Sequence, residues 1–236
     1  MNIDIIYIIV SAEFEKDRLN YLQNYFQINN IDIPIKYYEP FYKNRDEHAV
    51  DMQYYTNLNI AEIMLFCTYE KMFEEIIEKK YKYILTLESD VLFCDNFNEK
   101  LNTIFKEWVE RAEHPSILFI GNGVNRGYNQ KAQISDNLFE MNESKCTDSM
   151  IFDYDSIKYL ADKIKYIKNN GKLSNAVDRV IDHCIGLDIL SYWIKEPIII
   201  QGSQNGTYDS TIHPIRRNLR KNRKQRLAEK RKKIES

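Results

Sequence analysis

Short apolar runs alternate with longer amphipathic stretches along this chain, and this alternation predicts strands that alternate with helices. The runs that we expect to form strands are residues 4–10, 34–38, 82–93, 116–120, 150–152 and 192–200. The stretches with helical spacing of apolar residues are 16–27, 60–79, 97–109, 157–164 and 175–185. Such an order is typical of α/β proteins, in which a mixed, mostly parallel sheet is flanked by helices.

Capping patterns and breaks refine these boundaries. Asn59 followed by Glu62, and Asn96 followed by Glu99, are capping-box patterns that predict the starts of two helices. Residues 125–142 are polar and without a clear period, so we expect a mobile loop over a site there.

Two carboxylates, Glu88 and Asp90, follow the apolar part of the strand predicted at 82–93. Side chains at i and i+2 of an extended chain point to the same side, so this pair would project together while Ser89 faces away. Two anions side by side at the end of a buried strand repel each other and lose hydration unless a cation compensates them. Mg²⁺ or Mn²⁺ would supply that charge, and ligands of open α/β sheets bind at the carboxyl ends of strands. The pattern indicates a metal–diphosphate site; the plainer alternative is a solvated turn with two unrelated acids.

Length and composition fit one large domain. The 236 residues suffice for a sizeable core, and no apolar run approaches the roughly 18 residues that cross a membrane. Residues 3–10 are too short and lack a basic lead, so we expect a first strand there and not a signal peptide. The 4 cysteines are scattered without a Cys-x-x-Cys pair, which argues against zinc and disulfides and for a reducing, cytoplasmic location.

The net charge of −2 hides a basic C-terminus, since residues 216–233 hold eleven Lys or Arg against the single acid Glu229. Apolar positions are sparse there, so we expect a main domain over 1–213 and a basic tail over 214–236. The tail would suit an anionic membrane surface, which would make the protein peripheral to a membrane; the plainer alternative is a solubilising extension. Nucleic acid is a less favoured partner, because no aromatic residues for base stacking are interleaved with the basic ones.

Several motifs together resemble glycosyltransferase family 25, which includes lipooligosaccharide and collagen hydroxylysine galactosyltransferases. The family's Gly-Glu-Ile-Gly-Cys, Ser-His and Glu-Asp-Asp motifs correspond here to Ala61-Glu62-Ile63-Met64-Leu65, Thr68-Tyr69 and Glu88-Ser89-Asp90. Further on, Ala176-Val177-Asp178 resembles its Pro-Val-Asp segment, and 197–201 with 210–212 resembles its terminal segment. The order of these pieces covers most of residues 1–213. The helix glycines, the Ser-His pair and the middle acid of the acidic motif are absent.

This resemblance implies a GT-A fold and a metal-dependent, inverting transfer of a hexose, galactose or glucose. The donor would be a UDP-sugar with Mn²⁺ (or Mg²⁺), and the acceptor a hydroxyl of a glycan or glycoprotein. Asp90 would be the direct metal ligand, and Glu88 would reach the ribose or, through water, the metal. Asp178 would be the general base, because its position matches the family's Pro-Val-Asp acid; the alternative is a capping role three residues after Ser174 or Asn175.

Further candidates each carry a structural alternative. Val10 and Ser11 follow the first strand, where GT-A folds hold the nucleotide base, and Arg18 would meet a phosphate or be a surface charge. Asp148 is a second acceptor-side acid or a turn former. Glu62 matches a family position, but its spacing from Asn59 also explains it as a helix cap.

His213, after the final motif, would be a third metal ligand or a surface histidine. Two other function classes remain open at this point: a catalytically silent relative that binds glycans, and a nucleic-acid-associated protein acting through the tail.

Overall fold

The computed structural model describes residues 2–11, 13–39, 54–122, 132–141 and 146–208. Residues up to Gln201 form one compact α/β unit, and the chain from Gly202 onward is grouped as a second unit. The described part of that second unit holds the short helix α7 (Gly202–Asn205). The predicted boundary between residues 213 and 214 and the basic tail lie outside the described residues.

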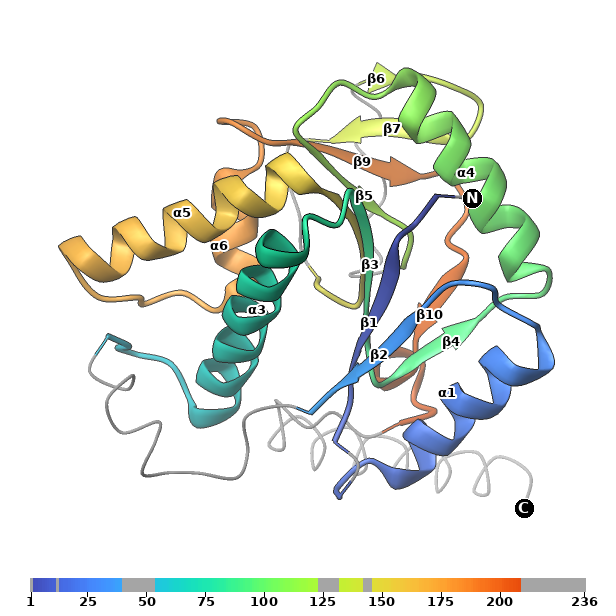
Figure 1. Ribbon diagram of the computed structural model, residues 1–236, viewed down its shortest axis with the longest axis horizontal. Helices are drawn as coiled ribbons and strands as arrows, with labels where there is room; N and C mark the ends of the chain where they lie inside the picture. The colour runs from blue at the N-terminus through green and yellow to red at the C-terminus, as the bar shows by residue number, and fades with distance from the viewer. Residues whose placement is uncertain (1, 12, 40–53, 123–131, 142–145, 209–236) are drawn as a thin grey trace, which may run out of the picture. The chain divides into compact units, whose positions relative to one another are not determined.

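The centre of the first unit is an eight-stranded sheet with the order β2-β1-β3-β8-β5-β9-β7-β6 (Figure 1). Its strands are β1 (Ile5–Ile9), β2 (Ile35–Tyr38), β3 (Tyr83–Glu88), β5 (Ser116–Phe119), β6 (Ala132–Gln133), β7 (Leu138–Met141), β8 (Ser149–Asp153) and β9 (Leu190–Ile194). Strands β2, β1, β3, β5 and β9 run in one direction, whereas β8 and β7 run against their neighbours. The predicted class, an α/β domain with a mixed, mostly parallel sheet flanked by helices, is confirmed. A separate antiparallel pair joins β4 (Val91–Phe93) to β10 (Ile199–Gln201).

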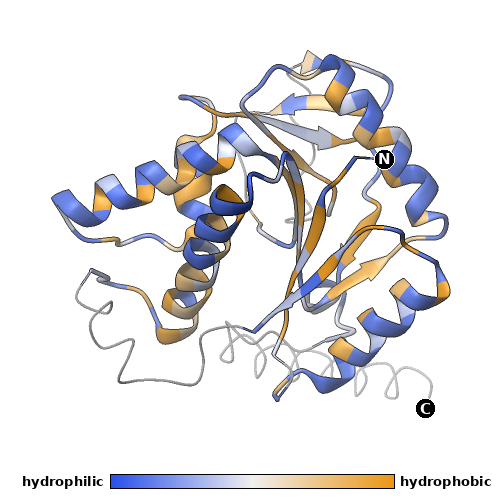
Figure 2. Ribbon diagram, viewed as in Figure 1, coloured by the Kyte–Doolittle hydropathy of each residue, from blue (hydrophilic) through white to orange (hydrophobic). Residues whose placement is uncertain are grey.

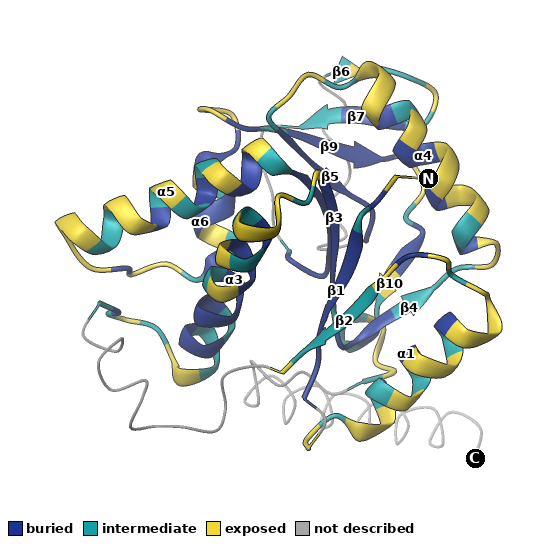
Figure 3. Ribbon diagram, in the orientation of Figure 1, coloured by how far each residue is buried: buried dark blue, intermediate teal, exposed yellow. Residues whose placement is uncertain are grey.

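Helices cover both faces of the large sheet. Their bounds are α1 (Lys16–Ile28), α3 (Ile60–Lys79), α4 (Phe97–Arg111), α5 (Tyr154–Asn170) and α6 (Val177–Cys184). Apolar residues of α3, α5 and α6 pack with Ile5, Tyr7 and Ile9 of β1, and those of α1 and α4 pack with Ile6 and Ile8. Because both faces of β1 are covered, all five of its residues are buried, and β3 is likewise buried from Tyr83 to Leu87 (Figure 3).

Hydropathy follows this layering. The strands and the inward faces of the helices are apolar, and the outward faces of the helices are polar (Figure 2). Among the helices that the structure describes, none is both long and apolar enough to span a bilayer.

Most helix positions match the sequence pattern. Helix α3 begins after Asn59 with the predicted capping box: the Asn59 side chain accepts a hydrogen bond from Glu62 N (3.0 Å), and Glu62 Oε2 accepts one from Asn59 N (2.9 Å). The capping box predicted at Asn96 is wrong. Asn96 adopts a left-handed conformation (φ 57°) and its side chain makes no cap, so α4 begins without one. Val109, predicted on the buried face of α4, is 36% exposed.

Three predicted segments differ from the structure. The strand predicted at 82–93 is two strands, β3 and β4, which belong to different sheets and are separated by a turn at Ser89 and Asp90. The last strand, predicted at 192–200, is also two strands, β9 and β10, separated by the exposed Lys195 and Glu196 and by Pro197, which has no N–H to donate to a sheet. The segment 125–142, predicted as a loop, holds β6 and β7 in its described part, because Ala132 and Gln133 pair with Glu140 and Phe139. Residues 123–131 and 142–145 lie outside the described residues.

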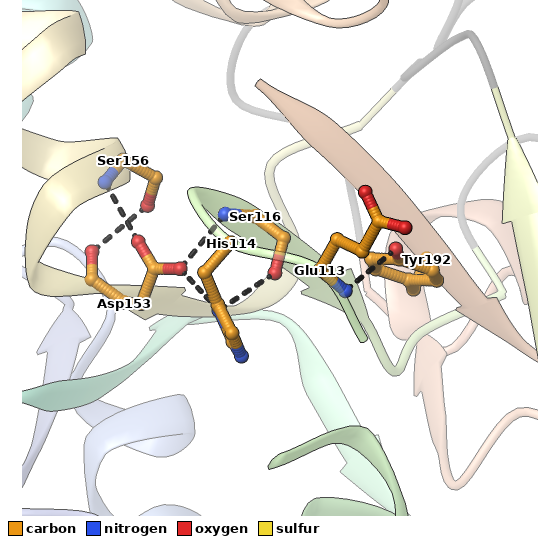
Figure 4. A network of polar contacts seen from close by, with 6 residues as sticks. All are labelled: Glu113, His114, Ser116, Asp153, Ser156 and Tyr192. Carbon is orange, nitrogen blue, oxygen red and sulfur yellow. Dashed lines mark hydrogen bonds and ion pairs between the residues drawn. The ribbon is translucent and has the colours of Figure 1, made fainter. Parts of the chain in front are cut away.

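A polar network fixes the start of β5 to the end of β8 (Figure 4). Asp153 Oδ2 accepts from Ser116 N (2.8 Å) and lies 2.6 Å from His114 Nδ1, while Asp153 Oδ1 caps α5 through Ser156 N (2.7 Å). Ser116 Oγ also contacts His114 Nδ1, at 3.1 Å, so Ser116 and Asp153 interact with the same ring nitrogen. That arrangement joins strand ends and starts a helix; it does not activate the serine hydroxyl, which would need the other nitrogen.

Candidate active site at the carboxyl end of the sheet

The parallel strands bring several of the predicted residues to one end of the sheet. In register, Ile9 of β1 lies opposite Glu88, the last residue of β3. Since β8 is antiparallel to β3, its start reaches this same end, where Glu88 N donates to Asp148 O (2.9 Å). Val10, which follows β1, is buried there. The carboxyl end of the sheet therefore collects residues that are far apart in the sequence.

The charges of three other carboxylates act on Glu88 at this end. Asp90 is 6% exposed in the turn after β3, and Glu88 is partly buried. Burial raises the pKa of Glu88, and the charges of Asp90, Asp148 and Asp178 raise it further, while a hydrogen bond from Thr147 lowers it. Glu88 thus lies within electrostatic reach of both predicted acceptor-side acids, and Asp90 within reach of Asp148.

Asp148 lies deepest in this group, at 2% exposure. Burial raises the pKa of Asp148 to about 6, with a further contribution from the charge of Asp90 and an opposing one from the Ser149 hydroxyl, which donates to it (3.0 Å). The residue precedes β8 and its side chain packs against Gly121, just after β5. A β-carbon on Gly121 would lie 2.0 Å from Asp148 Oδ2, so only glycine leaves room for this carboxylate.

Two further residues hold Glu88, and sequence reasoning missed both. The Thr147 hydroxyl donates to Glu88 Oε1 (2.5 Å), and the Tyr69 hydroxyl of α3 donates to the Thr147 carbonyl (3.1 Å). Tyr69 is fully buried and stands where the family resemblance expects the histidine of a Ser-His pair. A tyrosine in place of that histidine was the one sequence feature that could have drawn attention to Tyr69.

Asp178 occupies the first turn of α6 and is partly buried. Burial raises the pKa of Asp178, while Arg179 N, which donates to its Oδ1 (2.9 Å), opposes that shift. Ala176 is the N-cap residue and makes no side-chain cap, so the capping role considered for an acid after Ser174 or Asn175 is not formed. The buried residues of α6 are Val177, Val180, Ile181 and Cys184, so Asp178 lies off the buried stripe of its helix.

The segment between β1 and α1 contacts the acidic turn from the other side. Ser11 is buried, its N–H donates to Glu15 Oε2 (3.0 Å), and its hydroxyl donates to Glu39 Oε1 (2.7 Å). Arg18 pairs with Glu15 (2.5 Å) and donates to Ser89 Oγ (2.9 Å). The Arg18 side chain is 11% exposed, so the alternative of a surface charge does not hold.

Glu62 and His213 are the remaining candidates. The Glu62 carboxylate is engaged in the capping box of α3, which accounts for its position by helix chemistry alone. His213 lies outside the described residues.

The donor set agrees in kind with a hard divalent cation, because its side chains offer carboxylate oxygens and their mutual repulsion would be relieved by positive charge. Among the described residues, no three His, Cys, Asp or Glu side chains are arranged to hold a metal ion by themselves. Mg²⁺ typically takes only one or two carboxylates and completes its shell with water and substrate phosphates. The residues present fit a metal shared with a phosphate ligand better than an all-protein metal site.

Comparisons with known proteins give only distant structural neighbours. No family model matches the chain, and no curated protein matches it. Protein A197 from STIV is similar over 80% of both chains, at 14% identity and a TM-score of 0.41.

Two further neighbours carry transferase names. Mannose-1-phosphate geranyltransferase from Thermus thermophilus is similar over 82% of this chain and 74% of its own, at 9% identity and a TM-score of 0.41. A glycosyltransferase involved in glycosylation of the major capsid of PBCV-1 is similar over 70% of this chain and 67% of its own, at 12% identity and a TM-score of 0.36. Membership of family 25 is not confirmed.

Proposed function

We propose that this protein is a metal-dependent, inverting glycosyltransferase that moves a hexose, galactose or glucose, from a UDP-sugar to a hydroxyl of a glycan or protein acceptor. The observation that carries the proposal is that Glu88, Asp90 and Asp148 lie together at the carboxyl end of the sheet, with Asp178 within electrostatic reach of Glu88. Isolated acids on a solvated turn would not be buried and would not raise one another's pKa values. The plainer alternative for the acidic pair is therefore disfavoured.

In this proposal Asp90 and Glu88 face the donor. Asp90 would be the direct ligand of Mn²⁺ or Mg²⁺, and Glu88, held by the Thr147 hydroxyl, would reach the ribose or a metal-bound water. The bound metal would supply Lewis-acid stabilisation of the charge on the departing diphosphate. Arg18 is held nearby on Ser89 and would add a fixed positive charge for the phosphates.

Asp178 would serve the acceptor. The acceptor oxygen forms a bond to the anomeric carbon, while the bond from that carbon to the diphosphate oxygen breaks and its electron pair leaves with UDP. The hydroxyl proton passes to the Asp178 carboxylate, whose raised pKa makes it a better base than an exposed aspartate. Asp148 is the second candidate for that role, but its deep burial suits a supporting carboxylate better.

The proposal is tested by calorimetry of UDP binding with Mn²⁺ and with EDTA, followed by a panel of UDP-sugars assayed for Mn²⁺-dependent release of UDP. We expect binding that requires the metal and release from one hexose donor above all others. The Asp90→Ala variant should lose the metal-dependent part of binding while its melting temperature stays unchanged or rises slightly, since one repelling charge is removed.

Metal-dependent UDP binding without release from any donor would indicate a catalytically silent relative. Equal metal dependence in the Asp90→Ala variant would refute the role of Asp90.

A further inference from the structure

A three-residue cluster links the acidic turn to the start of α1. We refer to Glu15, Arg18 and Ser89 as the serine cluster. Glu15 Oε1 accepts from Ser89 Oγ (2.7 Å) and from Arg18 (2.5 Å), and Ser89 Oγ accepts from Arg18 (2.9 Å). The other oxygen of Glu15 accepts from Ser11 N at the end of β1 (3.0 Å).

Ser89 fills a chemical role here that a carboxylate cannot fill. Its hydroxyl donates to Glu15 and accepts from Arg18 at the same time, whereas an ionised aspartate can only accept. An acid at this position would lose the bond to Glu15 and place a second anion against it. The serine that replaces the middle acid of the motif is therefore matched to Glu15.

We propose that Glu15 and Ser89 are positioning residues of the nucleotide site, an inference that rests on the proposed function. Ser89 lies between Glu88 and Asp90 in the chain, so its bonds to Glu15 and Arg18 fix the turn that carries both acids. Through Ser11, the same carboxylate fixes that turn relative to the end of β1. A site whose groups are held in place before binding loses less conformational entropy when the ligand arrives.

The competing explanation is a cluster that serves stability alone. Buried ion pairs contribute little net stability, because the loss of hydration offsets the attraction between the charges. A purely structural cluster would change the melting temperature and leave the affinity of the folded protein for its ligand unaltered. The two roles are thus separated by measuring affinity and melting temperature on the same variants.

The experiment uses the full chain and titrates UDP in the presence of Mn²⁺ at a temperature at which every variant is folded. Ser89→Ala removes both hydroxyl bonds, Glu15→Gln removes the charge at nearly constant shape, and the double variant combines them. We expect each single variant to bind about tenfold more weakly, as for loss of a hydrogen bond to a charged group, and the double variant to be little weaker than either. Ser89→Thr, which keeps the hydroxyl, should restore most of the affinity. Asp17→Asn, an equal charge change on the exposed first turn of α1, is the matched control and should bind as wild type does.

Three results would overturn the inference. Wild-type affinity in Ser89→Ala and Glu15→Gln would show that the cluster positions nothing, and additive losses in the double variant would show that the two residues do not act together. Absence of Mn²⁺-dependent UDP binding in the wild-type protein would refute the proposed function and the inference with it. That last result is recognisable because it precedes any substitution.

Discussion

At the scale of single residues, the site is a collection of carboxylates whose surroundings disfavour their charge. Glu88, Asp148 and Asp178 all have raised pKa values, and burial is the largest cause for each. Such an arrangement stabilises neither the folded chain nor the charged acids until a cation arrives. Because burying these repelling charges destabilises the folded chain, the cluster is better explained by a role in function than by a role in stability.

Asp148 should make the metal-free protein less stable as the pH rises. Its pKa is about 6 in the folded protein, against an ordinary value of 3.8, so between these values the folded state binds more protons than the unfolded state. Stability should therefore fall from about pH 4 to about pH 6, by up to about 3 kcal/mol for this group. Urea unfolding in EDTA across this range, compared between wild type and Asp148→Asn, measures the contribution. An unchanged pH slope in the variant would contradict it.

Asp178→Asn should separate transfer from binding. The variant keeps the size of the side chain and the start of α6, so affinity for UDP and Mn²⁺ should stay near wild type. Transfer to the acceptor should fall by about 100-fold or more, as expected for loss of a general base. Asp182→Asn, on the next turn of the same helix, makes the same charge change and should leave transfer intact. If transfer survives in Asp178→Asn, the base lies elsewhere, and Asp148 would be substituted next.

At the scale of secondary-structure elements, the site depends on how closely β5 and β8 approach each other. Ile120 N donates to Ser149 O (3.3 Å) just beyond the paired residues of these strands. Gly121 lies at this point with the Asp148 carboxylate against its α-carbon. The close approach has no room for a side chain.

Gly121→Ala should therefore displace the side chains that pack against the backbone at this point. Its β-carbon would meet Asp148 Oδ2 at 2.0 Å and Ser149 Oγ at 2.3 Å, which forces both side chains to move. We expect a loss of about 1 to 3 kcal/mol in stability, as for overpacking of a core, together with weaker UDP binding. Urea unfolding and calorimetry measure the two effects. Gly171→Ala is the control, because the nearest atom to its β-carbon would be 3.8 Å away and its backbone is extended.

The sequence pattern predicted an element well where the spacing of apolar residues within that element is enough to define it. The apolar spacing and the Asn59–Glu62 pair set the bounds of α3, and the apolar run within 82–93 placed Glu88 at the end of a strand, with Asp90 in the turn that follows. Patterns failed where the pairing partner decides the structure. Pro197 was an available signal for the break between β9 and β10, but nothing in 192–200 indicates that β10 pairs with β4.

The same limit applies to the site. Glu88 and Asp90 were found because they directly follow a buried apolar run, although a turn, and not the predicted extended chain, carries Asp90. Thr147, Gly121 and Glu15 were not found, since each matters through one contact with a residue more than twenty positions away. Such contacts exist only in the folded sheet.

At the scale of the whole molecule, charge is divided unevenly. The carboxyl end of the sheet gathers acids, while eleven Lys or Arg lie within residues 216–233. We expect the two regions to bind different things: the acids a cation with a nucleotide, and the basic segment an anionic surface.

Truncation after His213 should leave UDP binding near wild type and abolish attachment to anionic membranes. Each basic residue contributes about 1 kcal/mol near a charged lipid surface, and this attraction is screened by salt. Co-sedimentation with liposomes containing phosphatidylserine, at low and high salt, measures it. Loss of UDP binding on truncation would show that the segment belongs to the site. Salt-sensitive binding of DNA or RNA by the full chain only would favour the nucleic-acid alternative.

The antiparallel strand β8 between β3 and β5 also constrains the time course of folding. Thr86 and Met150, which are partners across β3 and β8, are 64 positions apart in the chain. Closing so long a loop is slow and unfavourable until the contacts on both sides are made. Because Asp148 and Thr147 enter with β8, a nascent chain has no complete acid cluster before that pairing. The repulsion that Asp148 adds to Glu88 and Asp90 therefore arises only once β8 has paired with β3.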